Sequence, residues 1–84
     1  MRSELVTGGG MKHSDFKRLV MQEIANGAVR FKIVCIDKEI SLCWTNAQGF
    51  LCNSILYTVS RSRMSQYERR RLQMYRFWLK NEMP

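Results

Sequence analysis

Apolar residues recur at helical spacing close to the start of the chain. The residues that share one face at this spacing are Phe16, Leu19, Val20 and Ile24. Ser14 precedes them as a predicted N-cap, because its hydroxyl can accept a hydrogen bond from a free amide of the first turn. Gly27 follows them and can adopt the left-handed conformation that ends many helices. The pattern therefore predicts a helix over residues 15–25.

Strict alternation of apolar and polar residues predicts two strands, Val29–Ile36 and Glu39–Thr45. A two-residue turn between them pairs Ile36 with Glu39 and gathers the apolar residues of both strands on one face. The other expected pairs are Cys35 with Ile40, Ile33 with Leu42, and Phe31 with Trp44. The opposite face then carries Arg30, Lys32, Ser41 and Thr45. A shift of one residue would mix the two faces, so the pattern specifies the register.

Residues 50–60 are compatible with a strand or a helix, and we favour a third strand. Ile55, Tyr57 and Val59 alternate there with Ser54, Thr58 and Ser60, and β-branched side chains are frequent. The preceding residues 45–49 are rich in Asn and Gly and are expected to form a loop.

The last part of the chain predicts a second, longer helix. Ser65 and Glu68 have the spacing of a capping box, and the helix is expected to extend to about Glu82. Its apolar side consists of Met64, Tyr67, Leu72, Tyr75, Trp78 and Leu79, and its opposite side of Arg69, Gln73, Arg76 and Lys80. Arg70 and Phe77 flank the polar side. Arg71 falls at the edge of the apolar side, where its stem can pack while its charge reaches water.

These elements predict a small α+β fold, in which an antiparallel meander carries both helices on its apolar face as a two-layer sandwich. We expect residues 11–84 to form one domain. Residues 1–10 end in three glycines and are expected to be a flexible segment, either native or left from cloning. Double-stranded-RNA-binding domains and several unrelated small folds share this order of elements, so the order transfers no function.

Charge is concentrated in the second helix and the residues just before it. The 84-residue chain has 14 Lys and Arg against 7 Asp and Glu, a net charge of +7. Residues 61–84 contribute seven basic and two acidic residues, or +5 of this total. Arginine dominates, and its planar guanidinium suits phosphate. The candidate nucleic-acid-binding residues are Arg61, Arg63, Arg69, Arg70, Arg76, Phe77 and Lys80. On the sheet, Arg30 and Lys32 extend this basic field.

Other classes of function fit the sequence poorly. No apolar run is long enough to span a membrane, and we expect no signal peptide. Three cysteines and a single histidine lack the spacing of a zinc site, so we expect reduced thiols in the cytoplasm and no metal or cofactor. His13 is expected to be a solvated residue before the first helix. No catalytic set or P-loop is present, and we therefore predict that the protein is not an enzyme. Ser62 and Ser65 are read as capping serines rather than phosphorylation sites.

Residues 11–19 resemble the first helix of HicA-type RNA-cleaving toxins, which also run helix, three strands, helix. The glycine-serine-histidine segment that carries that family's histidine is missing here, so the resemblance implies no nuclease activity. It is compatible with a role that involves RNA.

The first hypothesis is a small binding or regulatory protein that contacts the backbone of DNA or RNA through the Arg-rich helix. The alternative is a protein-binding inhibitor or adaptor, of the kind that phages and plasmids use. It would dock the same helix on an acidic surface of a host nucleic-acid-processing enzyme. A third option is an amphipathic helix on an anionic membrane surface. The exposed edges of a three-stranded sheet also leave a homodimer open.

Overall fold

The computed structural model describes residues 11–84, without the side chain of Arg61, and the segment 1–10 that the sequence predicts to be flexible lies outside the described residues. The elements follow the chain as α1 His13–Ala25, β1 Val29–Ile36, β2 Glu39–Thr45, β3 Leu51–Tyr57, a 3-10 turn Arg61–Arg63 and α2 Gln66–Asn81. The predicted helix–strand–strand–strand–helix order is therefore confirmed.

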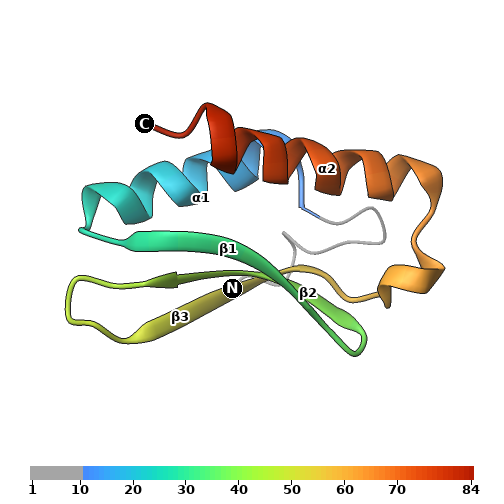
Figure 1. Ribbon diagram of the computed structural model, residues 1–84, viewed down its shortest axis with the longest axis horizontal. Coiled ribbons are helices and arrows are strands. Elements are labelled where there is room, and N and C mark those ends of the chain that lie inside the picture. The colour runs from blue at the N-terminus through green and yellow to red at the C-terminus, as the bar shows by residue number, and fades with distance from the viewer. Residues whose placement is uncertain (1–10) are drawn as a thin grey trace.

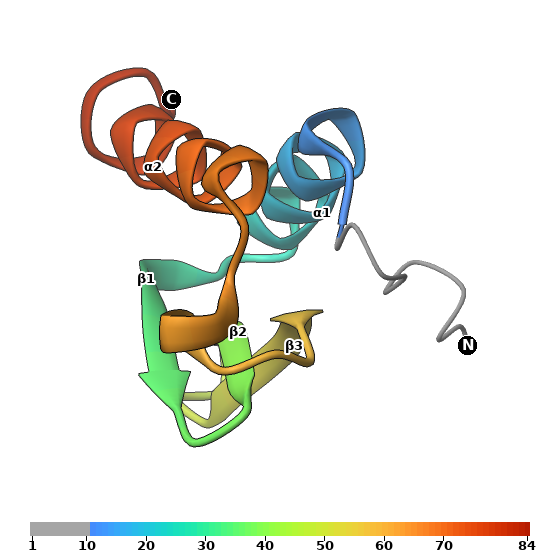
Figure 2. The ribbon, with the colours of Figure 1, turned by 90° about the vertical axis from the view of Figure 1, so that its right-hand side faces the viewer.

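The three strands form one antiparallel sheet in the order β1-β2-β3, and both helices lie on the same side of it (Figures 1 and 2). The two helices run in the same general direction (Figure 1). This is the predicted two-layer α+β sandwich. Within residues 11–84, neither helix is long and apolar enough to cross a membrane.

The start of α1 differs from the prediction. The helix begins at His13, its N-cap is Lys12, and no side chain caps it, so Ser14 lies in the first turn rather than at the cap. The reason is tertiary: Met11 is buried, and its amide donates to the carbonyl of Leu56 at 3.2 Å. The chain direction is thereby fixed before the helix begins, without a side-chain cap.

The end of α1 follows the prediction. Gly27 has a φ of +93°. Its amide donates to Ile24 O at 2.9 Å, and the next amide, of Ala28, donates to Glu23 O at 2.9 Å. This pair of bonds is the Schellman arrangement that a glycine after a helix allows.

The hairpin of β1 and β2 has the predicted register over most of its length. Ile36 pairs with Glu39, Cys35 with Ile40, and Ile33 with Leu42. The expected pair of Phe31 and Trp44 is displaced, because an irregularity between Val29 and Lys32 inserts one extra residue in β1. Arg30 has a φ of +62° at this bulge. The two rings still stack, with centroids 6.0 Å apart.

A third strand is confirmed in the ambiguous segment, with bounds of Leu51–Tyr57 instead of 50–60. Its predicted alternation breaks near the end, since Ser41 pairs with Ile55 and Ile40 with Tyr57. Leu56 is therefore the extra residue of a bulge, and both Leu56 and Tyr57 are buried. Ile55 and Tyr57, which were expected on one face, lie on opposite faces.

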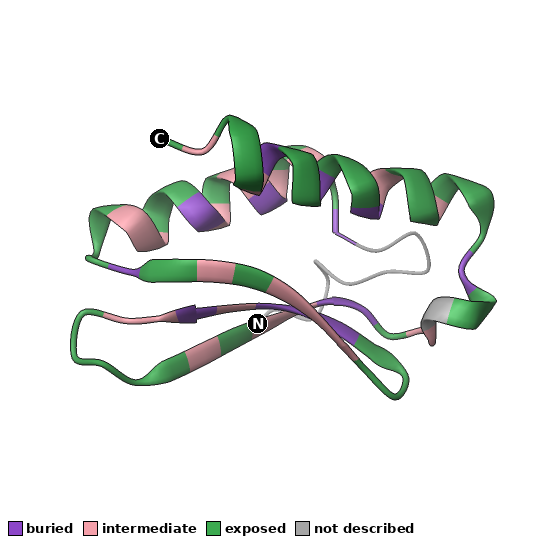
Figure 3. Cartoon of the chain, viewed as in Figure 1, coloured by how far each residue is buried: buried purple, intermediate pink, exposed green. Residues whose placement is uncertain are grey.

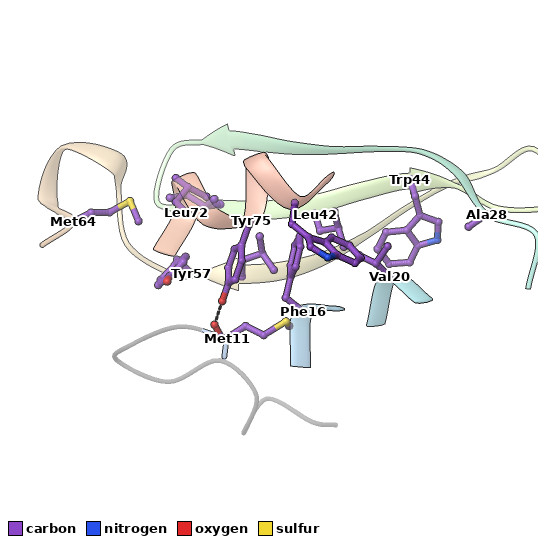
Figure 4. Close-up of a cluster of buried hydrophobic side chains, with 13 residues drawn as sticks. Met11, Phe16, Val20, Ala28, Leu42, Trp44, Tyr57, Met64, Leu72 and Tyr75 are labelled. Carbon is purple, nitrogen blue, oxygen red and sulfur yellow. Dashed lines mark hydrogen bonds between the residues drawn. The ribbon is translucent and has the colours of Figure 1, made fainter. Parts of the chain in front are cut away.

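The core lies between the helices and the sheet (Figures 3 and 4). Phe16 of α1 stacks on Tyr75 of α2, with ring centroids 4.1 Å apart, and the Tyr75 hydroxyl donates to the Met11 carbonyl (Figure 4). Most of the apolar residues predicted for α2 are buried or partly buried. Tyr67 is the exception, since 61% of it is exposed.

The capping box of α2 is confirmed. The amide of Glu68 donates to Ser65 Oγ at 3.2 Å, and the Ser65 amide donates to Glu68 Oε1 at 2.8 Å. Two of the free amides at the start of the helix are thus satisfied, and Glu68 is held at the helix N-terminus.

Candidate nucleic-acid interface

The outer surface of α2 is lined by cations. Leu72, Tyr75 and Trp78 point into the core, and this orientation fixes which side of the helix meets water. The predicted site residues on this helix that are exposed are Arg69, Arg70, Arg76, Phe77 and Lys80. The structure therefore brings these five together on one side of one element.

The 3-10 turn before α2 extends this surface toward the N-terminus of the helix. Arg63 is exposed there, and its amide donates to Ser60 O at 2.9 Å, which closes the turn. Arg61 begins the same turn, and its side chain lies outside the described part of the structure.

The side of α2 that faces β1 is a shallow basic hollow. It is lined by Arg76 and Lys80 of α2, by Lys32 of β1, and by partly buried apolar residues of both elements, Phe31, Ile33 and Leu79. Arg76 Nη2 lies 3.7 Å from Cys35 Sγ. Toward the start of the helix, Arg69 Nε donates to the Met64 carbonyl at 3.2 Å. Arg69 therefore also fixes the connection that leads into α2.

The side of α2 that faces α1 is a larger and more apolar groove of about 700 Å³. Its lining consists of His13, Lys17, Arg70, Gln73, Met74, Phe77, Trp78 and Glu82. Phe77 and Met74 are 59% and 54% exposed. Lys17 Nζ lies 5.9 Å from the centroid of the Trp78 ring, within the range of a cation–π contact. The groove thus combines an exposed aromatic ring with basic groups from both helices.

His13 lies at the wall of this groove, and the prediction of a solvated residue outside the helix is wrong. It is the first residue of α1, and its ring stacks on Tyr75 with a centroid distance of 5.2 Å. Its Nδ1 is buried and has no hydrogen-bond partner among the residues that the structure describes. Desolvation, followed by repulsion from Lys17 and Arg71, lowers the pKa of His13, while Glu82 opposes this shift. The ring is therefore neutral at pH 7.

Arg71 has a structural place instead of a surface one. Its Nη1 donates to the Met11 carbonyl at 3.3 Å, and its Nη2 donates to the Tyr67 hydroxyl. The guanidinium carbon also lies 4.7 Å from the centroid of the Tyr67 ring. This agrees with the prediction that Arg71 sits at the edge of the apolar side and not with the other cations.

Sequence reasoning found the residues of α2 but missed the contribution of α1. His13 and Lys17 join the groove because the two helices lie side by side, which no local pattern reveals. The one available signal is their spacing of four residues, which places both on one face of a helix. Met74 was missed because a single exposed methionine between Gln73 and Tyr75 carries no pattern of its own.

In the 11–84 range there is no group of three His, Cys, Asp or Glu side chains that could hold a metal ion. Cys35, Cys43 and Cys52 are free thiols. Comparison with protein families, curated proteins and solved structures gives no significant match.

Proposed function

We propose that this protein binds nucleic acid through α2 and the 3-10 turn before it, with a preference for unpaired strands. The observation that carries the proposal is the exposed basic side of α2, which borders a groove with an exposed aromatic ring. The residues assigned to contact the nucleic acid are Arg61, Arg63, Arg69, Arg70, Arg76, Phe77 and Lys80. To these the groove adds Lys17.

The charge of α2 supports an anionic partner because few acidic groups neutralise it. Glu68 is engaged in the capping box, and Glu82 lies beyond the last residue of the helix. Arg69, Arg76 and Lys80 recur at intervals of seven and four residues, so like charges lie close along one face. Such an arrangement costs stability in isolation and favours binding to phosphates, which releases condensed counterions.

The groove supports single-stranded over double-stranded nucleic acid. Phe77 presents its ring to water, and stacking of an unpaired base on an aromatic side chain contributes about 1–3 kcal/mol per base. Lys17 and Arg70 line the same groove, where they can meet phosphates of the nucleotide that stacks. Bases in a duplex are already stacked and cannot enter. Backbone contacts and stacking discriminate weakly between sequences, so we expect little sequence preference.

We assign the protein a binding or regulatory role without catalysis, in the cytoplasm. A reducing compartment suits its three free thiols. In the described part of the groove, the titratable side chains besides the cations are His13, at the start of α1, and Glu82, just after α2.

Fluorescence anisotropy with a labelled oligonucleotide tests the proposal. A single strand and its duplex are titrated with the wild-type protein, Phe77→Ala and Phe50→Ala. Phe50 is 68% exposed in the β2–β3 loop and controls for the loss of an exposed aromatic ring. We expect tighter binding of the single strand, a loss of about 5-fold or more for Phe77→Ala, and no change for Phe50→Ala. If all three proteins bound the single strand and the duplex with equal affinity, the groove would be excluded as the binding site.

A second candidate is a protein partner with an acidic surface, such as a host nucleic-acid-processing enzyme that this protein inhibits. Phe77 and Met74 next to Arg70 form the kind of exposed aromatic, methionine and arginine group that dominates protein interfaces. Capture from nuclease-treated lysate tests it. A stoichiometric partner that is retained by the wild type and by Phe50→Ala but lost with Phe77→Ala would favour this second function.

A further inference from the structure

The sheet face that points away from the helices is open and partly apolar. It is opposite the layer that both helices cover (Figure 2). The residues on this outer face, given by the strand register, are Val29, Lys32, Val34, Ile36, Glu39, Ser41, Cys43, Thr45, Leu51, Asn53 and Ile55. Most of them line a hollow of about 330 Å³.

This outer face exposes more apolar surface than an open antiparallel sheet usually does. Such sheets place polar residues on the side that meets water. Here Ile36 and Leu51 are 65% and 83% exposed, and Val34 lies between the strand positions of Lys32 and Ile36. A surface of this kind indicates a protein partner.

The charges of the outer face identify the kind of partner. Its charged side chains in the paired register are one cation, Lys32, and one anion, Glu39, so the face is neutral although the chain carries +7. Lys32 pairs with Cys43, and Glu39 pairs with Ile36, so the two charges lie on either side of a middle row. This middle row contains Val34, Ser41 and Ile55, since Val34 pairs with Ser41 and Ser41 with Ile55.

We propose that this outer face binds the same face of a second copy of the chain. We place a two-fold axis between the two sheets, across the strands and level with the middle row. Rotation about this axis reverses the strand direction of the second copy. Val34 and Ile55 then pack on their own counterparts near the axis. Lys32 then faces the partner's Ile36 and lies next to the partner's Glu39, which is on the neighbouring strand, and by symmetry Glu39 lies next to the partner's Lys32. One rotation therefore packs Val34 and Ile55 on their own counterparts and brings each cation next to an anion.

The resulting dimer is a four-layer sandwich in which the sheets pack face to face about 10 Å apart. With three short strands per copy, the buried area is at the lower end of the range for specific interfaces, which starts at about 1,000 Å² of total buried area. We therefore expect a reversible dimer with a dissociation constant in the micromolar range. Both α2 helices remain on the outside, far from the contact.

Charge reversal gives a sharp test. Lys32→Glu leaves two glutamates on the outer face, and Glu39→Lys leaves two lysines. Either variant alone places like charges in contact twice per dimer, but an equimolar mixture restores two opposite-charge pairs. Lys38→Glu and Glu23→Lys, alone and mixed, make the same charge changes off this face and serve as controls.

Analytical ultracentrifugation without nucleic acid is the readout. We expect wild-type protein and both controls to approach twice the 10.0 kDa chain mass with rising concentration. The dissociation constant of each outer-face variant should be at least 10-fold higher than that of the wild type, and the equimolar mixture should regain wild-type dimerisation. Circular dichroism spectra that match the wild type show that the variants are folded.

Three results would overturn the proposal. One is a wild-type protein that stays monomeric at about 500 µM. Another is a dimer that tolerates both single reversals, as expected if edge strands pair instead. The last is a mixture that dimerises no better than its components. None of these depends on nucleic-acid binding, so the dimer and the proposed function fail independently.

Discussion

Salt dependence is the property of the proposed complex that reports most directly on α2. The cations that α2 and its preceding turn expose, apart from the undescribed Arg61 side chain, are Arg63, Arg69, Arg70, Arg76 and Lys80. Each phosphate that a cation neutralises on a single strand contributes about −0.7 to the slope of log affinity against log salt. Counted for these five cations alone, the contacts give a slope of about −3.5, or a loss of roughly 100-fold in affinity between about 50 and 200 mM salt, and contacts by Arg61 and Lys17 make it steeper.

The perturbation is the double variant Arg76→Gln with Lys80→Gln. These two residues lie on the β1 side of the helix and leave the Arg69 bond to the Met64 carbonyl intact. Removing two contacts predicts a slope of about −2.1, and the loss over the same salt range falls to roughly 20-fold. Affinity at the lowest salt also falls, because two phosphates stay unneutralised.

The assay is fluorescence anisotropy of a labelled single strand at four or more salt concentrations. Arg18→Gln with Lys38→Gln removes the same net charge from exposed positions on α1 and in the β1–β2 turn. This control should keep a slope near −3.5. If both double variants reduce the slope equally, attraction depends on net charge alone and the assignment to α2 is refuted.

Three further predictions concern stability. His13 has a lowered pKa in the fold, so lowering the pH through its ordinary value of 6.5 protonates the unfolded chain first. Wild-type stability in urea should then fall between pH 7.5 and 5.5 by more than that of His13→Gln, and equal losses would contradict this. A Cβ at Gly27 would lie 2.9 Å from that of Ala47, whereas Gly49 has nothing within 4 Å. Both glycines have positive φ, so Gly49→Ala should lower the free energy of unfolding by about 1–2 kcal/mol, and Gly27→Ala should lower it further. A larger loss for Gly49→Ala than for Gly27→Ala in urea unfolding would contradict this prediction. Tyr75→Phe removes a donor to the Met11 carbonyl and should cost about 1 kcal/mol in urea unfolding; no change would mean that the bond contributes nothing.

Local patterns sufficed for the elements and most of the register, because each depends on neighbours in the chain. The pairing of Ile33 with Leu42 follows from alternation alone, and the Ser65 cap follows from one spacing. The bulges at Arg30 and Leu56 could not be predicted, since nothing in the alternation of apolar and polar residues marks them. Alternation assumes a regular strand, and one inserted residue reverses the faces beyond it.

The candidate site also has one part that the sequence predicts and one part that it does not. The basic side of α2 follows from helical periodicity and the position of the apolar residues. The groove does not, because it needs Lys17 and His13 from a helix about 60 residues earlier in the chain. The distribution of charge along the sequence therefore indicates the surface, and only the packing of α1 against α2 indicates where an aromatic base could bind.

The central claim is that nucleic acid binds to the α2 side of the molecule. An amide chemical-shift titration with a short single strand at low salt tests it most directly. We predict shifts concentrated in α2, the preceding turn and the start of α1, with none on the outer face around Val34 and Ser41. Shifts concentrated on that outer face, or no shifts at low salt, would contradict the account.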